Sequence, residues 1–343
     1  MSYICLANTC SIAVNCPGEV LSIQYLQKEF QLHWTGLSLN LPIVGEVLLE
    51  EDIRIPASAV LLCSNRLYAK DGVVFCKDGN SILALELEES LFQIRVNRST
   101  SGSLLALVLQ TLLNWYIPRY GLVFLHTASF RFNEKVYAIH GFGGAGKTET
   151  MIEALQRGAQ YLSDDLAIFD QEGFIHPYYR RIGLHDYSFT DEQLTKLHID
   201  KKKYGLMKMC EKRNDRISRY IFQRLRGHFK ISVSPEQLYS FSTSISVIDR
   251  LKVDLHYWLD LSDETCIAEI SNESFIQRMT FCMQNEFRSF VDFDGYFGFL
   301  YEFWGTKRLE HDALLQKVVS SIDIIGLRIK GQNYNELACL ILE

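Results

Sequence analysis

The chain has 343 residues, of which 48% are hydrophobic and 22% charged, a composition typical of a soluble globular protein. Its net charge of −6 argues against nucleic acid or an anionic membrane as partner, because no global basic field attracts phosphate. The nine cysteines form no CxxC pair, and no basic region followed by a long apolar run occurs within residues 1–20. We therefore expect reduced thiols, no signal peptide and a cytoplasmic location.

Residues 1–98 are predicted to form a β-rich N-terminal accessory domain. Short apolar or alternating runs recur there, and turn signals such as Lys70-Asp71-Gly72 separate them. No combination of residues in this part suggests catalysis. The predicted strands are Ser22–Tyr25, Val60–Leu62, Leu67–Tyr68, Val73–Phe75, Ile82–Leu87 and Phe92–Val96.

Residues 99–343 are predicted to form a second domain, of the α/β class. An apolar helix is expected from about Leu104 to Tyr116, ending before Pro118, and it is too short to span a bilayer. Because a strand, a glycine-rich loop, a helix and another strand then follow, we expect a βαβ unit and a sheet with parallel pairs. The predicted elements are a strand at Gly121–Leu125, a hairpin of Phe130–Phe132 and Val136–Ile139 about Asn133-Glu134, a helix at Lys147–Arg157 and a strand at Gln160–Leu162.

Two helix-start signals and a basic segment mark the region near residues 190–245. Thr190-Asp191-Glu192-Gln193 and Ser234-Pro235-Glu236-Gln237 both have the pattern of a capping box. Lysines and arginines are dense between residues 200 and 230, so we predict a basic helical insertion here. Its basic face is either solvated or in contact with an acceptor or a phosphate, since arginine side chains suit such anions.

The segment Gly141-Phe142-Gly143-Gly144-Ala145-Gly146-Lys147-Thr148 matches the pattern G-x-x-x-x-G-K-[ST] in full. Its glycines let successive backbone N–H groups turn toward a phosphate, Lys147 reaches the outer phosphates, and the Thr148 hydroxyl binds Mg²⁺. The loop follows an apolar strand and opens a helix, whose positive end adds to the attraction. We therefore predict that ATP, or another nucleoside triphosphate, binds with Mg²⁺ at this loop and at Glu149, which follows it.

Two adjacent carboxylates, Asp164 and Asp165, end the strand that follows the helix after the loop. Neighbouring side chains of an extended strand point to opposite sides, so we expect one to contact metal or water and the other to deprotonate an acceptor hydroxyl. Alternatively, one or both cap the following turn. His126 ends the strand at Gly121–Leu125 and is a candidate for orienting the acceptor, although a structural role fits equally well. His140, just before the loop, is either functional or a packing residue.

Together these residues resemble the C-terminal kinase domain of HPr kinase/phosphorylase. That family has a strand-terminal His, a loop of the form G-x-x-G-x-G-K-S-E, then a Gly, and then a strand ending in Asp-Asp. Here His126, the loop with Lys147-Thr148-Glu149, Gly158 and Asp164-Asp165 follow at agreeing spacing within about residues 104–187. The resemblance implies a P-loop kinase core similar to that of phosphoenolpyruvate carboxykinase.

The resemblance also implies a role for each matching residue. Asp165 would be the general base on a serine hydroxyl, Asp164 would assist it, and His126 would belong to the active site. Lys147 would bind phosphate, and Thr148 would bind Mg²⁺ together with Asp164. The HPr kinases also carry a Glu-x-Arg-Gly segment, which is lacking after Asp165 here, so neither phosphorylase activity nor HPr as the substrate is expected.

The amino-acid sequence of three segments resembles HPr-kinase-like proteins of ribosomal peptide biosynthesis, including lasso-peptide kinases, more than it resembles the HPr kinases. These segments are Leu125–Ser129, Tyr161–Asp165 and Tyr178–Leu184. The expected function is transfer of a phosphoryl group from a nucleotide to a serine of a peptide or protein, such as a ribosomal peptide precursor. A small-molecule kinase and a non-catalytic nucleotide-binding regulator are the alternatives. Homo-oligomerisation is left open.

Overall fold

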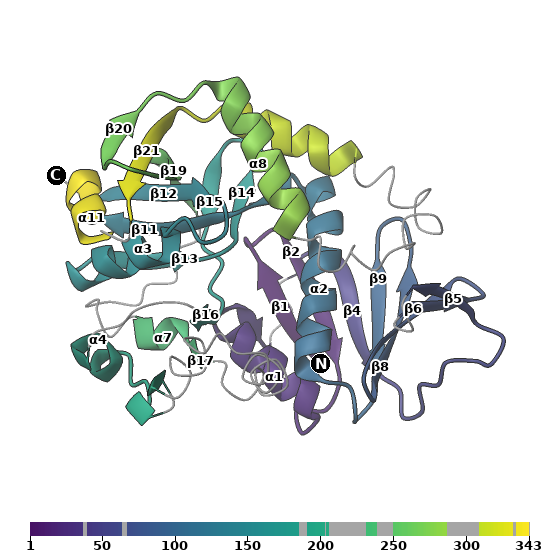
Figure 1. The fold of residues 1–343 in the computed structure, drawn as a ribbon. Helices are drawn as coiled ribbons and strands as arrows, with labels where there is room; N and C mark the ends of the chain where they lie inside the picture. Colours follow the sequence, from purple (N-terminus) through teal and green to yellow (C-terminus); the bar gives the residue numbers. More distant parts are fainter. Residues whose placement is uncertain are drawn as a thin grey trace.

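The computed structural model describes residues 1–36, 40–63, 67–184, 191–202, 204–205, 231–238, 250–286, 309–331 and 334–342. They form a mixed α/β structure with two large sheets, which confirms the predicted class at this level. Residues 2–96 contribute the first sheet, and the second carries the glycine-rich loop (Figure 1). Among the described residues, no helix combines the length and the apolar character needed to cross a membrane.

The first sheet has nine strands in the order β3-β1-β2-β4-β9-β8-β7-β6-β5. Neighbouring strands are antiparallel except for the pairs β2–β4 and β4–β9, which are parallel. The strands predicted between Val60 and Val96 are confirmed as β5 to β9. The bounds are β1 (Ser2–Leu6), β2 (Cys10–Asn15), β3 (Trp34–Thr35), β4 (Ile43–Leu49), β5 (Val60–Cys63), β6 (Leu67–Lys70), β7 (Val73–Asp78), β8 (Ser81–Leu87) and β9 (Phe92–Val96).

The strand predicted at Ser22–Tyr25 is wrong, because this segment belongs to helix α1 (Leu21–Glu29). Ile23, Leu26 and Phe30 are all buried, and their spacing of three and four residues is that of one helix face. A window of four residues is too short to reveal this period. Helix α1 packs beside α2 (Gly102–Tyr116), the helix that the sequence predicts before Pro118.

The second sheet has six strands in the order β13-β11-β12-β19-β21-β20. Strands β12, β19 and β21 run parallel, and β11 lies antiparallel between β12 and β13. The predicted parallel pairs therefore exist, but β12 forms its pair with β19 and not with β13. The bounds are β11 (Thr127–Phe132), β12 (Lys135–Gly141), β13 (Gln160–Ser163), β19 (Leu255–Ser262), β20 (Cys266–Ala268) and β21 (Ile324–Lys330).

The hairpin predicted about Asn133-Glu134 is confirmed, since β11 and β12 pair on either side of these two residues. Their φ angles of 47° and 65° are left-handed, which suits a two-residue hairpin turn. The turn sets the register that brings Thr127 opposite His140, beside the glycine-rich loop. Local turn chemistry thus positions the end of β12, from which the loop starts.

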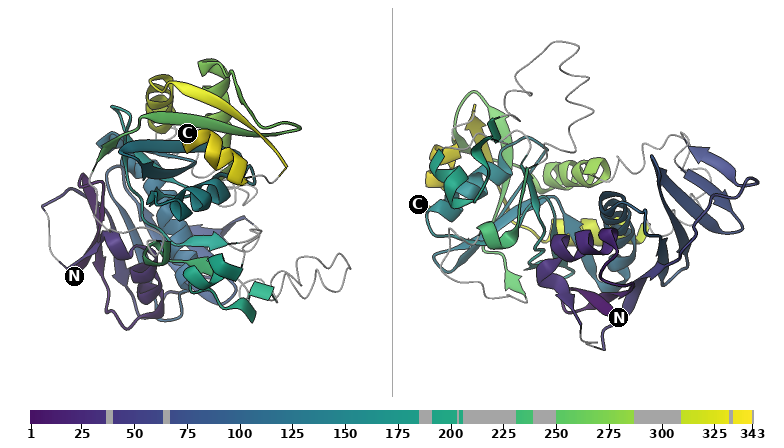
Figure 2. Two further views of the ribbon diagram at one scale, coloured as in Figure 1. Left: turned by 90° about the vertical axis from the view of Figure 1, so that its left-hand side faces the viewer. Right: turned by 90° about the horizontal axis from the view of Figure 1, so that it is seen from below.

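Helices cover both faces of the second sheet (Figure 2). Helices α3 (Lys147–Gln156) and α11 (Tyr334–Leu342) share a core with Tyr257 and Leu259 of β19. Helix α8 (Asn272–Glu286) packs through Phe275 on Trp258, which points to the other face because side chains alternate along a strand. A smaller sheet shares the main core with α2; its strands are β10 (Leu122–Leu125), β14 (Ala167–Asp170), β15 (Phe174–His176) and β18 (Leu251–Lys252).

An outer group of short elements contains the two predicted helix starts. Helix α4 (Asp191–Lys196) begins where the first signal predicts, and α7 (Pro235–Leu238) follows the second. The capping box is reciprocal in α7, because Ser234 N donates to Gln237 Oε1 at 2.9 Å and Gln237 N donates to Ser234 Oγ at 3.3 Å. Strands β16 (Ile182–Leu184) and β17 (Ile231–Val233) pair nearby. Within the predicted basic insertion near residues 190–245, residues 190, 203, 206–230 and 239–245 lie outside the described residues.

An ion pair joins α1 to the segment after β15. Arg180 donates to Glu29 Oε1 from Nε at 3.0 Å and from Nη2 at 2.7 Å, and its third nitrogen donates to Gln110 of α2. The Glu29 side chain is 6% exposed, so its removal leaves a largely buried guanidinium without its carboxylate. We expect Glu29→Ala to lower the free energy of unfolding in urea by about 3 kcal/mol.

The control for this prediction is a surface ion pair of the same residue types. Glu89 is 90% exposed and lies 3.5 Å from Arg119. Because solvent screens such a pair, Glu89→Ala should change the free energy of unfolding by less than about 1 kcal/mol. Equal effects of the two substitutions would contradict the larger contribution to the free energy of unfolding that is expected of the Glu29–Arg180 pair.

Candidate functional site

The glycine-rich loop connects the end of β12 to the start of α3. Gly141 needs to be glycine because a Cβ there would lie 2.8 Å from the Leu259 carbonyl oxygen of β19. Gly146 has a left-handed φ of 100°, and Thr150 N makes a helical hydrogen bond to its carbonyl oxygen. The N–H groups of residues 147–149 precede this bond, so the positive end of α3 faces the loop. This is the backbone arrangement that holds a phosphate in other proteins.

Lys147 lies inside the loop with only 5% of its surface exposed. Its Nζ donates to the Gly141 carbonyl oxygen at 3.0 Å and to the Phe142 carbonyl oxygen at 3.1 Å. These carbonyls hold the ammonium group at the centre of the loop. An anion in the loop would therefore meet a cation that is already in place.

Thr148 and Asp164 are in direct contact, although 16 residues separate them in the chain. Thr148 Oγ1 donates to Asp164 Oδ1 at 2.8 Å, and both side chains are buried. Asp164 Oδ2 is also buried, and it has no hydrogen-bond partner within the described part of the chain. Burial raises the pKa of Asp164 well above 3.8, and the charge of Asp165 raises it further. A hydroxyl and an undersatisfied carboxylate fit Mg²⁺, which takes oxygen ligands and completes its shell with phosphates and water.

Asp165 is exposed, whereas its neighbour Asp164 is buried. Its φ of 62° is left-handed, and Leu166 N donates to the Asp164 carbonyl oxygen at 2.7 Å across it, which makes a tight turn. Thr127 N donates to the Asp165 carbonyl oxygen at 3.2 Å and ties this turn to the start of β11. Strained turns of this kind cluster at functional sites. The two adjacent carboxylates therefore occupy different environments.

His126 is buried between β10 and β11, where it interacts electrostatically with Lys147. Burial lowers the pKa of His126 to about 3, and the nearby ammonium of Lys147 contributes to the shift. The imidazole is thus neutral at physiological pH. It can hydrogen-bond an acceptor or a phosphate oxygen there, but it adds no positive charge.

His140 belongs to a buried chain of polar groups behind the loop. Its Nδ1 lies 2.6 Å from Thr127 Oγ1, and its Nε2 lies 3.0 Å from Nδ1 of His256 on β19. The two imidazole rings are nearly coplanar, with an interplanar angle of 6°. Burial lowers the pKa of His140 and that of His256, the latter to about 4, so both rings are neutral. The contacts assign His140 to positioning of strands β11, β12 and β19.

The buried histidines predict a loss of stability in acid. The pKa of such a histidine is about 6.5 in the unfolded chain and much lower in the folded protein, so below pH 6.5 the unfolded chain binds a proton that the folded protein does not. The free energy of unfolding is therefore highest above pH 6.5 and decreases as the pH falls. We expect the free energy of unfolding to decrease between pH 6.5 and 4, by on the order of a few kcal/mol for His126 alone. Urea denaturation over this range measures the effect.

A matched pair of variants isolates the contribution of His126. His126→Asn removes the buried imidazole and should reduce the decrease in stability over this pH range. His198 is exposed and has a left-handed φ of 53°, which asparagine also adopts, so His198→Asn should leave the pH profile unchanged. Identical profiles for wild type and His126→Asn would show that His126 is not the titrating group.

The structure brings the predicted residues of the site to one edge of the second sheet. Strands β12 and β13 both run antiparallel to β11, so the loop and the two aspartates lie at the same end of the sheet. Thr148 contacts Asp164, and Lys147 interacts electrostatically with both Asp164 and His126. Glu149 occupies the first turn of α3 and is half-buried.

Two further residues lie at this site although no motif marks them. Arg180 is near Asp165: burial opposes its charge, yet its pKa is raised because Tyr178, Glu29 and Asp165 stabilise it. Tyr334 packs its ring on Gly146 of the loop. Arg180 lies within the Tyr178–Leu184 segment noted for its resemblance. The contact of Tyr334 with Gly146 had no signal in the sequence, because it joins two distant parts of the chain.

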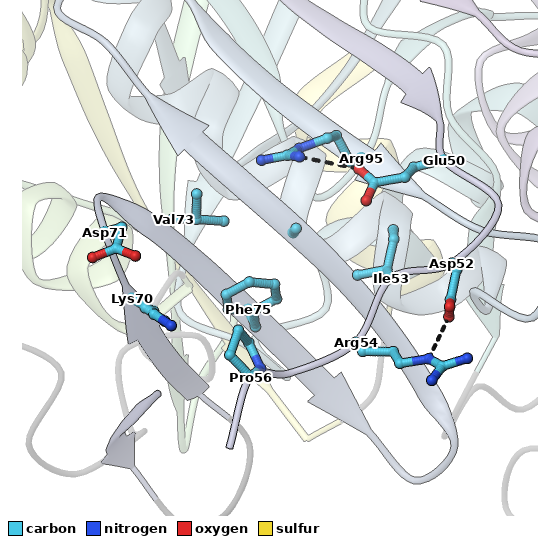
Figure 3. Close-up of a pocket in the computed structure, with 11 residues that line it drawn as sticks. Glu50, Asp52, Ile53, Arg54, Pro56, Lys70, Asp71, Val73, Phe75 and Arg95 are labelled. Atoms are coloured by element: carbon cyan, nitrogen blue, oxygen red, sulfur yellow. Dashed lines mark hydrogen bonds and ion pairs between the residues drawn. The ribbon is translucent and has the colours of Figure 1, made fainter. Parts of the chain in front are cut away.

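A hollow with a volume of about 370 Å³ lies on the first sheet, away from the glycine-rich loop (Figure 3). Two of the cations that line it already have carboxylate partners. Arg54 Nε lies 2.8 Å from Asp52, and Arg95 Nη1 lies 3.0 Å from Glu50. The hollow is therefore a poorer site for an anion than the glycine-rich loop.

The chain matches no protein-family model and no curated protein.

Proposed function

We propose that this protein is a kinase that transfers a phosphoryl group from a Mg²⁺-bound nucleoside triphosphate, such as ATP, to a serine hydroxyl of a peptide or protein. The observation that carries the proposal is the contact between Thr148 and Asp164 at 2.8 Å, next to Lys147 and the exposed Asp165. It brings a phosphate cradle, a candidate cation site and a candidate base together, as a P-loop kinase would require.

The loop residues account for binding of the phosphates. Backbone N–H groups at the start of α3 and the ammonium of Lys147 provide positive charge within the loop. On binding, phosphate oxygens would replace the carbonyls of Gly141 and Phe142 as partners of the Lys147 ammonium. The charge of Lys147 would then stabilise the outer phosphoryl group.

Thr148 and Asp164 account for the metal. The Thr148 hydroxyl and Asp164 Oδ2 are the oxygens that would hold Mg²⁺ together with the phosphates. When bound, this ion neutralises charge that develops on the transferring phosphoryl group. The raised pKa of Asp164 expresses how unfavourable its buried charge is without a cation.

Asp165 accounts for activation of the acceptor. Its carboxylate takes the proton of the serine hydroxyl, the serine oxygen bonds to the γ-phosphorus, and the bond from that phosphorus to the bridging oxygen breaks to release the nucleoside diphosphate. Asp165 is exposed, so a large acceptor such as a peptide has access to it. The neutral His126 next to Lys147 can orient the acceptor by a hydrogen bond.

The choice of a peptide acceptor rests on the resemblance of Leu125–Ser129 and Tyr161–Asp165 to the kinases of ribosomal peptide biosynthesis. The test offers HPr and the peptides encoded beside the gene to the protein at equal concentration, with labelled ATP and Mg²⁺. Faster labelling of a peptide is expected. Faster labelling of HPr would defeat the choice of acceptor, and labelling of free serine or a sugar alone would replace it with a small-molecule kinase.

A further inference from the structure

The candidate site has two sides, and the aspartates occupy only one of them. Asp164 and Asp165 follow β13, which is separated from β12 by β11. On the other side of β12 lie β19 and then β21, both parallel to it, so their carboxyl ends open at the same edge as the loop. Ligands of such sheets bind outside these carboxyl ends. A nucleotide held by the loop therefore has the β21 side available for its nucleoside.

Tyr334 lies on that side, at the start of α11, the helix that follows β21. A Cβ atom added to Gly146 would lie 2.2 Å from Tyr334 Cε1, so the ring rests directly on the last glycine of the loop. Burial and the charge of Glu149 raise the pKa of the Tyr334 phenol, which places the ring near the first turn of α3. The residue is only half-buried, so part of it remains accessible beside the loop.

Helix α11 holds this ring in a fixed place. It packs against α3 (Figure 1), and Leu337 and Ile341 are buried in the core that the two helices share. At the other end of α3, Arg157 Nη2 donates to Asn335 Oδ1 at 2.6 Å. An aromatic ring that is already ordered loses little conformational entropy when a ligand stacks on it.

We propose that Tyr334 is a nucleoside-binding residue whose ring stacks on the base of the bound nucleotide, an assignment that rests on the proposed function. With the outer phosphates directed to Thr148 and Asp164, the nucleoside leaves the loop past Gly146 and meets the ring. Every base has a flat π face, so stacking contributes affinity for any nucleoside and none for the phosphates themselves. Tyr334 would thus contribute to the affinity for the nucleoside, whereas the loop binds the phosphates.

Calorimetric titration with MgATP and with magnesium tripolyphosphate tests the assignment, because only ATP has a base. Tyr334→Ala should weaken ATP binding by about 10-fold and leave tripolyphosphate binding unchanged. Tyr334→Phe keeps a flat ring and should bind ATP as the wild type does. Leu340→Ala is the matched control, since it removes a large side chain that is 37% exposed from the far end of the same helix.

Each outcome decides the assignment. Equal ATP affinity in wild type and Tyr334→Ala would overturn it and leave the proposed function intact. Equal weakening of both ligands would also overturn it, because the substitution would then act on the loop and not on the base. A wild-type protein that binds neither ligand would defeat the proposed function together with the assignment. Should Tyr334→Ala fail to fold, Tyr334→Leu keeps the bulk without the flat ring and should show the same selective loss of ATP affinity.

Discussion

Replacing Lys147 with alanine is expected to slow phosphoryl transfer by about 10²–10³-fold or more, while the protein remains folded. The ammonium is the only cation of the loop, and the carbonyls of Gly141 and Phe142 hold it where the outer phosphates would lie. Charge on those phosphates is redistributed during transfer, so a cation in place contributes most in the transition state. Turnover of labelled ATP at saturating Mg²⁺ measures the loss.

Lys135→Ala is the matched control for this experiment. Lys135 begins β12, the strand that leads into the loop, and is exposed, so the control removes the same charge from a nearby surface position outside the loop. Thermal melting of both variants verifies that they fold. If a folded Lys147→Ala protein turned over as fast as Lys135→Ala, the assigned role of Lys147 would be wrong.

The elements around the loop could be predicted because their signals are local. Asn133-Glu134 marks a two-residue turn, α2 ends at Tyr116 before Pro118, and Gly158 ends α3 with a left-handed φ of 93°. Each signal acts within a few residues. The convergence of Asp164 with Thr148 was also predictable, since the strand after the helix returns to the same sheet edge.

The contacts that complete the site could not be predicted because they join distant parts of the chain. His140 meets His256 across 116 residues, and Arg180 meets Glu29 across 151. Such pairs depend on how distant elements are arranged in the fold, which no periodicity encodes. The pairing of β12 with β19 illustrates this, since the apolar pattern of β12 would equally fit a sheet in which β13 were its neighbour.

Replacing Asp165 with asparagine is expected to slow phosphoryl transfer by about 10²–10⁴-fold and to change nucleotide affinity little. The substitution is mild for the fold because asparagine adopts the left-handed backbone that Asp165 has, with a φ of 62°. It removes the negative charge and, with it, the ability to accept a proton. Single-turnover transfer to the peptide, together with a separate measurement of ATP binding, distinguishes the two effects.

Asp71→Asn is the matched control, because Asp71 is also exposed and also left-handed, with a φ of 51°, but lies in the turn between β6 and β7. Asp164→Asn should act differently from Asp165→Asn. It removes the buried carboxylate that Thr148 contacts, so more Mg²⁺ should be needed for half-maximal activity. A severe loss in Asp164→Asn that added Mg²⁺ does not restore, combined with a mild effect of Asp165→Asn, would reverse the two roles. The exposure of Asp165 and the burial of Asp164 favour the assignment made here, since a base must reach its acceptor and a metal ligand need not.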